Sequence, residues 1–172
     1  MSDEKIIIET DEAQDESSDL KKNSMRVLAF SLGGENYCAE IHQIRSVVRV
    51  ESITRIPNAP DFVIGVTNLR GQILPVIDIR SFFGLAQKKR TEKSRVIVSD
   101  VTGSSIGILV DDVKQAMEID EAAIQPPLAT VSEKLATYTK GQFQMQDAII
   151  IILDLEKVLR SEDIDNLKRG DK

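Results

Sequence analysis

The sequence has no tryptophan, only two tyrosines and five phenylalanines, one cysteine and one histidine. With Cys38 as the single cysteine, no internal disulfide can form, and Cys38 and His42 together provide too few nitrogen and sulfur ligands for a usual metal site. The few aromatic rings leave little surface on which the bases of a single-stranded nucleic acid could stack. We therefore expect no metal, no cofactor and no nucleic-acid partner.

Long hydrophobic runs are also missing. The longest, AIIIIL at residues 148–153, is far shorter than the roughly 20 residues that a membrane-spanning helix needs. The acidic amino terminus lacks the basic and then apolar order of a signal peptide. We expect a soluble, cytoplasmic protein without direct membrane insertion, and we interpret AIIIIL as a buried central strand.

Acidic residues are concentrated at the amino terminus. Residues 1–24 contain eight acids and three lysines, a net charge of −5, whereas the rest of the chain contains 20 acids and 19 bases. The charge and the Ser/Asp content predict a disordered tail over residues 1–24, within which IIIE at 6–9 is a candidate for a short docking strand. The nearly neutral body offers no basic face for phosphates, which argues against a nucleic-acid binder.

Short apolar segments, separated by turn residues about every ten positions, run through residues 25–160. This pattern is typical of β-barrels or β-sandwiches. We expect a strand pair around Gly33–Gly34, a helical turn within 41–48, and a closing helix that follows Asp154. Residues 161–172 are expected to form a carboxy-terminal tail.

A loose internal repeat divides the body of the chain. IRSVVRVESITRIP, which ends at Pro57, resembles VKQAMEIDEAAIQP, which ends at Pro126, an offset of 69. Gly65 and Gly141, like PVIDIRSFF and IILDLEKVL, are related by an offset of 76, and an insertion within LATVSEKLAT accounts for the difference. The repeat predicts two similar β units, at approximately residues 25–90 and 91–160.

The residues that could carry chemistry have simpler structural interpretations. Asp78 and Asp154 each follow a strand and precede apolar residues at helical spacing, so we interpret them as helix caps and not as an acid–base pair. Cys38 is expected to be a small core residue, and His42 a solvated or partly packed one. GSSIG at 103–107 lacks the Gly-Lys-Ser/Thr ending of a phosphate loop, and no serine lies in a Gly-x-Ser-x-Gly elbow. No catalytic residue is assigned.

The hairpin around Gly71 is the most distinctive segment. Gly71 is expected to supply a positive φ in the turn, and Pro75, which lacks an N–H, places its strand at a sheet edge or a bulge. An edge strand can accept another protein. Arg70 at the turn carries five hydrogen-bond donors, and it is a binding residue, a solvated turn residue or the partner in a local salt bridge.

The stretch from residue 55 to residue 84 resembles the signature of the CheW-like coupling proteins of bacterial chemotaxis; it is RIPNAPDFVIGVTNLRGQILPVIDIRSFFG. FSLGGENYCAEI, GILVDDVKQAMEI, YTKGQF and IILDLEKVL follow in the family's order, so the resemblance covers residues 25–160. It implies an all-β fold of two five-stranded SH3-like barrels around a shared core, with short connecting helices and a C-terminal helix. It also implies the absence of enzyme activity.

The resemblance further implies partners. Such domains bridge the cytoplasmic helical hairpin of chemoreceptors, held in a groove between the barrels, to the regulatory domain of the chemotaxis histidine kinase CheA, which uses barrel edges. The free protein is expected to be a monomer that is recruited to membrane-associated receptor arrays.

The family's functional positions map onto two segments of this chain, the Asn-Leu-Arg-Gly turn and the segment 41–50. Family members often carry a glutamate where Ser46 stands here, so a Glu–Arg70 pair would be missing unless Glu40 or Glu51 replaces it. We expect Ile44 and Val47 to be apolar contacts and Arg70 the charged one. The residues expected to contact partners are Ile41, Ile44, Ser46, Val47, Val48, Asn68, Leu69, Arg70 and Gly71.

Four alternatives remain open. The domain could belong to an adaptor fused to a receiver domain, although only a dozen residues follow the closing helix, so a free adaptor is expected. The same fold could serve a different signalling kinase, one that controls twitching or development. A hydrolase using Asp78, Asp154 or His42 would show activity in a broad screen. A nucleic-acid-binding barrel would shift nucleic acid in a gel in a salt-dependent way.

Overall fold

The computed structural model describes residues 5–6, 23–101, 103–128, 132–161 and 164. Most of the two predicted tails, and with them the prediction of disorder, lies outside these residues. The described part is mainly β-strand with short helices, which confirms the all-β class. The candidate docking strand of the amino-terminal tail is present in part, since Lys5–Ile6 forms strand β1.

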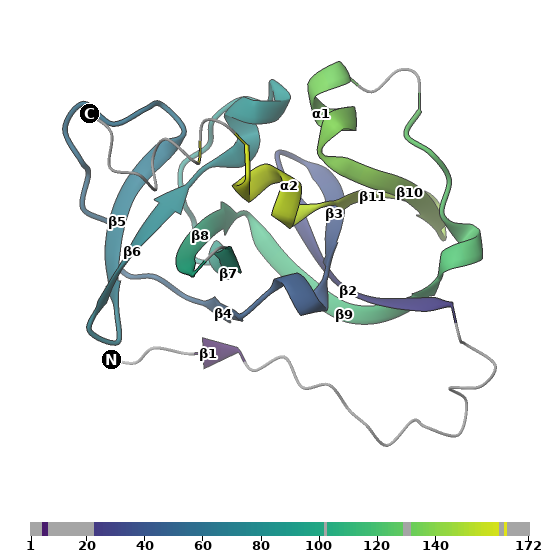
Figure 1. Ribbon diagram of the computed structural model, residues 1–172, viewed down its shortest axis with the longest axis horizontal. Coiled ribbons are helices and arrows are strands. Elements are labelled where there is room, and N and C mark those ends of the chain that lie inside the picture. The colour runs from purple at the N-terminus through teal and green to yellow at the C-terminus, as the bar shows by residue number, and fades with distance from the viewer. Residues whose placement is uncertain (1–4, 7–22, 102, 129–131, 162–163, 165–172) are drawn as a thin grey trace.

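The strands form two sheets. The first sheet has the order β1-β4-β7-β8-β6-β5, and the second has the order β10-β11-β3-β2-β9, so each has five strands apart from the two-residue β1. Figure 1 shows the two sheets side by side, with helix α2 between them. The first sheet consists of β1 (Lys5–Ile6), β4 (Ser46–Val48), β5 (Val63–Leu69), β6 (Gln72–Ile77), β7 (Arg95–Val101) and β8 (Ser104–Val110). The second consists of β2 (Ser24–Leu32), β3 (Glu35–Glu40), β9 (Asp112–Asp120), β10 (Thr139–Met145) and β11 (Ala148–Leu153).

The helices whose bounds lie within the described residues are all short. The expected helical turn within 41–48 is a 3-10 helix of only three residues, and Ser46–Val48 is a strand, in line with the preference of two consecutive valines for extended backbone. The helices are η2 (Ile41–Gln43), η3 (Ile79–Phe83), η4 (Glu121–Ala123), α1 (Glu133–Thr137) and α2 (Leu155–Leu159).

The internal repeat is visible in the strand pairing. Ala29 pairs with Cys38 in the second sheet as Val98 pairs with Gly107 in the first, and the offset between the two pairs is 69. The same strand order therefore occurs in both sheets, but the boundaries predicted for the two units, 25–90 and 91–160, do not match them. Each sheet takes strands from both halves of the chain, through the parallel pairs β6–β8 and β3–β11.

Gly65 and Gly141 occupy equivalent positions that exclude a side chain. Their φ angles are 154° and 145°, and an added Cβ would lie 2.2 Å from the carbonyl oxygen of Thr54 and 2.4 Å from that of Gln125, respectively. Each glycine therefore lets an irregular crossover segment pass against its hairpin, where Thr54 and Gln125 make isolated β-bridges.

The largest cluster of buried apolar side chains is shared by the two sheets. It includes Phe30 and Tyr37 from the second sheet, Ile77 and Ile97 from the first, and Leu155 of α2. Because strands of both sheets and helix α2 bury their apolar faces in one cluster, the predicted shared core is confirmed, and the two sheets are expected to unfold together.

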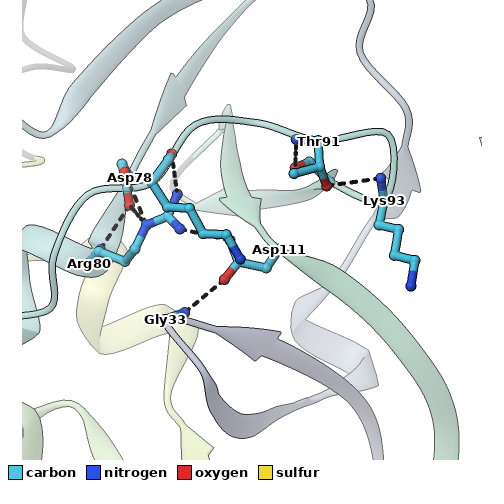
Figure 2. A network of polar contacts seen from close by, with 8 residues as sticks. Gly33, Asp78, Arg80, Thr91, Lys93 and Asp111 are labelled. Carbon is cyan, nitrogen blue, oxygen red and sulfur yellow. Dashed lines mark hydrogen bonds and ion pairs between the residues drawn. The ribbon is translucent and has the colours of Figure 1, made fainter.

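A buried ion cluster also joins the sheets (Figure 2). The Arg80 side chain is 1% exposed, and its guanidinium lies between two carboxylates, with Nε donating to Asp78 Oδ1 at 3.0 Å and Nη1 to Asp111 Oδ1 at 2.7 Å. Asp111 Oδ2 accepts a hydrogen bond from the N–H of Gly33 at 2.8 Å. Since Asp111 lies between β8 and β9 and Gly33 in the β2–β3 turn, the cluster connects η3 to both sheets.

Candidate docking site

A hollow of about 300 Å³ lies on the first sheet, where β4, β7 and the β5–β6 hairpin meet. Because β4 and β5 are far apart in the order of this sheet, the sheet must curl for both to line one hollow. We call it the Arg70 hollow. Its lining residues are Arg45, Ser46, Val48, Leu69, Arg70, Gln72, Ile73, Leu74, Val98 and Ser105.

The turn at the rim of the Arg70 hollow has the backbone that the sequence predicts at Gly71. Arg70 and Gly71 have φ angles of 56° and 84°, the two positive values that a type I′ hairpin turn requires. The side chain of Asn68 accepts a hydrogen bond from the Gly71 N–H at 2.9 Å. Asn68 and Gly71 therefore shape the turn, and the turn presents Arg70.

Arg70 is exposed, and within the described part of the chain its guanidinium has no hydrogen-bond or ion-pair partner. The local salt bridge considered from the sequence is therefore not formed with these residues. Arg45, which also lines the hollow, does have partners. Its Nη1 donates a hydrogen bond to Ser105 Oγ at 3.0 Å and lies 3.4 Å from Asp100 Oδ1. The five donors of Arg70 are available to a partner.

The two glutamates considered as partners of Arg70 lie elsewhere. Glu40 is paired with the exposed His42, at 3.0 Å, and with Lys140. Glu51 lines a separate groove with three arginines, one of which is Arg49. Neither glutamate therefore pairs with Arg70 in this structure. Ser46 itself lines the Arg70 hollow and brings no charge to it.

The segment before the hollow divides its side chains between two faces. Val47 is fully buried in the shared core and Ile44 is 9% exposed there, so neither side chain lies at the surface of the free chain, and their role as apolar contacts stays a prediction. Ile41 packs partly against the same core. The physical reason is that Ser46–Val48 is a strand, in which neighbours point to opposite faces, so that Val48 faces the hollow when Val47 faces the core.

The exposed apolar residue of the Arg70 hollow is Ile73, whose exposure of 65% is far above that of Leu74 beside it, at 3%. Sequence analysis missed Ile73. The signal was present, because ILPV at 73–76 follows the period of a strand, and Leu74 and Val76 on one face leave Ile73 and Pro75 on the other. The hollow thus offers one exposed aliphatic side chain beside one unpaired guanidinium.

The segment that carries β4 is anchored to helix α2. The side chain of Gln43 donates from Nε2 to Asp154 Oδ1 at 3.1 Å and accepts at Oε1 from the Leu155 N–H at 3.1 Å. Its backbone oxygen accepts from the Ser99 hydroxyl at 2.5 Å. These three bonds fix the start of the lining segment against β7 and α2.

Asp78 and Asp154 are N-cap residues. Asp78 accepts a hydrogen bond from the Arg80 N–H and Asp154 accepts one from the Lys157 N–H, each at the start of a short helix. Their carboxylates lie in different polar clusters, one with Arg80 and one with Gln43. The arrangement satisfies orphan N–H groups and does not form a carboxylate pair.

Cys38 is fully buried, and burial raises the pKa of its thiol to about 12, so the thiol stays protonated at neutral pH. Among the residues that the structure describes, no three His, Cys, Asp or Glu side chains gather in a group that could hold a metal ion. In the same part of the chain, no helix has the length and apolarity needed to cross a membrane.

The fold and the hollow define a class: a two-sheet β protein that presents, at a shallow surface, an exposed aliphatic residue and an arginine that has no partner among the described residues. The model of the CheW-like domain family matches residues 26–163. The chain is 34% identical to a chemotaxis protein CheW of Klebsiella aerogenes, over 83% of this chain and 88% of the relative. It is 30% identical to that of Helicobacter pylori, over 80% and 83% of the two chains.

A solved structure agrees with these sequence relatives. The crystal structure of the scaffolding protein TtCheW from Thermoanaerobacter tengcongensis is similar, with a TM-score of 0.70 and 34% sequence identity over 81% of this chain and 94% of that one. The chain belongs to the CheW-like family.

Proposed function

We propose that this protein is a non-enzymatic scaffold of bacterial chemotaxis, which couples the cytoplasmic hairpin of chemoreceptors to the regulatory domain of the histidine kinase CheA in the cytoplasm. The proposal is supported by family membership and by relatives named chemotaxis protein CheW and scaffolding protein. The observation that carries it is the Arg70 hollow, where a guanidinium without a partner in the described part of the chain lies next to an exposed isoleucine.

The chemistry of the hollow indicates what a partner must bring. Leu69 and Ile73 provide an apolar surface above the buried Val48, and Arg70 provides fixed positive charge at its rim. Few side chains carry most of the energy of such interfaces, and arginine and aliphatic anchors surrounded by neutral contacts suit this role. A partner that fits presents an apolar side chain and, next to it, a carboxylate that can accept two hydrogen bonds from Arg70.

The test is a titration of the full chain against the kinase's regulatory domain and, separately, against a receptor hairpin fragment. Arg70→Ala is expected to weaken binding of at least one partner by about tenfold or more, because losing a hydrogen bond to a charged group costs about 1.5–3 kcal/mol. Thermal stability should be nearly unchanged, since Arg70 is exposed and unpaired within the described residues.

The matched control is Gln146→Ala. Gln146 has the same φ, 56°, as Arg70 and occupies the equivalent turn between β10 and β11. This control separates the loss of the guanidinium from a general effect of alanine at a positive φ. Unaltered affinity of Arg70→Ala for both partners would contradict the role of the Arg70 hollow. Absence of binding by the wild-type protein to either partner would contradict the proposed function itself.

A further inference from the structure

Strand β1 occupies the edge of the sheet next to the Arg70 hollow. Lys5 pairs with Val48 and Ile6 with Val47, in antiparallel orientation, and Figure 1 shows β1 alongside β4. On its other side β4 pairs with β7. Without β1, the outer edge of β4 would expose unpaired backbone groups, the kind of edge that attracts another strand. Two of the three β4 residues, Ser46 and Val48, also line the hollow.

The sequence of the amino-terminal segment suits this edge. The run Ile6–Ile8 is the only apolar triplet in residues 1–24, which otherwise hold eight acids and three lysines. The segment that carries β4 is flanked by Arg45 and Arg49. An apolar strand former in an acidic segment therefore meets a short strand between two arginines, and both hydrophobic and charge complementarity favour this occupant over an unrelated strand.

The pairing is short enough to be reversible. It comprises two residue pairs, and residues 7–23 connect it to the next strand, β2. A ladder of this length is marginal on its own. A short covalent connection of this kind keeps the strand at an effective concentration of roughly millimolar, which makes rebinding fast and displacement by a partner feasible.

We propose that the amino-terminal strand is a cover in cis on β4, which competes with the partner of the Arg70 hollow for that edge of the site. The inference rests on the proposed function for the identity of the partner, and on the β1–β4 pairing for the cover. Removing the strand should raise the apparent affinity by about two- to tenfold, the factor expected if the cover occupies the edge for half to nine-tenths of the time.

The experiment compares the full chain with Ile6→Pro and with a chain that lacks residues 2–9. Proline at position 6 lacks the N–H and the backbone freedom that a strand pair needs. Thr10→Pro is the matched control, since it puts the same residue outside β1. The first readout is hydrogen exchange at Val47 and Val48, because successive strand amides point to opposite neighbours and one of these two faces β1. The second is partner affinity.

We expect faster exchange at one of the two amides and tighter partner binding in both altered chains, with Thr10→Pro like the wild type. Unchanged exchange would overturn the cover, and weaker binding would overturn it too, because the strand would then contribute to docking. A concentration-dependent dimer that Ile6→Pro abolishes would place the strand on a second copy and overturn pairing in cis. If the wild-type protein and every variant fail to bind either partner, the proposed function is contradicted, and the proposed competition with it. Faster exchange in the altered chains would then show that the strand covers β4 although the partner is wrong.

Discussion

At the scale of single residues, burial separates the roles of Tyr37 and Cys38 from that of Arg70. Tyr37 is 1% exposed and Cys38 is fully buried. Loss of hydration raises the pKa of Tyr37 from 10.0 to about 12, with a contribution from the charge of Glu35, and raises that of Cys38 from 9.0 to about 12. Arg70, by contrast, is exposed and unpaired within the described chain. Tyr37 and Cys38 thus stay neutral in the core, whereas Arg70 is the charged group that we propose for recognition.

The raised pKa values predict alkaline instability. Between about pH 9 and 12 the unfolded chain releases protons that the folded chain retains, so the free energy of unfolding falls as pH rises, by at most about 1.4 kcal/mol per pH unit for each group. Urea unfolding at pH 8 and at pH 10.5 measures the fall. Cys38→Ala should show a shallower fall than the wild type. Parallel curves for the two proteins would show that the thiol does not contribute.

At the scale of elements, the position of β4 depends on contacts outside the strand. Three residues cannot hold their place by one short ladder with β7, so the three bonds of Gln43 to Ser99, Asp154 and Leu155 set where the strand begins. The alternation along β4 then places Val48 in the Arg70 hollow. The hairpin contributes the opposite wall through a turn that holds Arg70 at positive φ. The Arg70 hollow therefore depends on two elements, β4 and the β5–β6 hairpin, each of which is positioned by its own contacts.

Gln43→Leu tests this bracing. The substitution removes both side-chain hydrogen bonds to the start of α2 and leaves the Leu155 N–H without its partner, so we expect a loss of about 1–3 kcal/mol in the free energy of unfolding. Urea denaturation measures it. Gln144→Leu, on an exposed position of β10, is the control and should change stability by less than about 0.5 kcal/mol. Equal effects of the two substitutions would contradict the bracing role.

At the scale of the whole molecule, exchange of strands and a shared core make the two sheets one cooperative unit. Each sheet contains strands from both halves of the chain, and the main apolar cluster draws on both sheets. The buried ion cluster of Asp78, Arg80 and Asp111 adds a polar connection between them. Buried charges of this kind are costly when a partner is lost, since the remaining charge has no water to solvate it.

Arg80→Met is therefore expected to destabilise the whole protein by about 3–5 kcal/mol, because it leaves the buried Asp78 carboxylate and the largely buried Asp111 carboxylate without their cation. A single cooperative transition should persist, since the shared core is unchanged. Arg160→Met is the control, because Arg160 pairs with Glu156 at an exposed site and such pairs contribute about 0–1 kcal/mol. A small effect at Arg80, comparable to that at Arg160, would mean that the carboxylates are protonated or solvated in the variant.

Much of this protein was determined by local sequence. Turn residues and period-two patterns predicted an all-β chain, the residues before short apolar runs predicted the caps at Asp78 and Asp154, and the signature at 55–84 predicted the family. The offsets of 69 and 76 predicted an internal repeat, and the paired residues of equivalent strands differ by the same offsets. Each of these predictions depends either on residues a few positions apart or on direct similarity between sequences. Both kinds of information are present in the sequence itself.

Only the tertiary structure decided how the halves combine. Strand exchange between the sheets depends on which edges meet across about seventy residues, and apolar strands of similar composition do not specify this locally. Burial of Arg80 follows from the approach of Asp111, and the separation of Val47 from Val48 follows from strand rather than helical backbone at 46–48. The Arg70 hollow forms because the curled sheet brings β4 against the β5–β6 hairpin, a closure that comes from packing and not from any one segment.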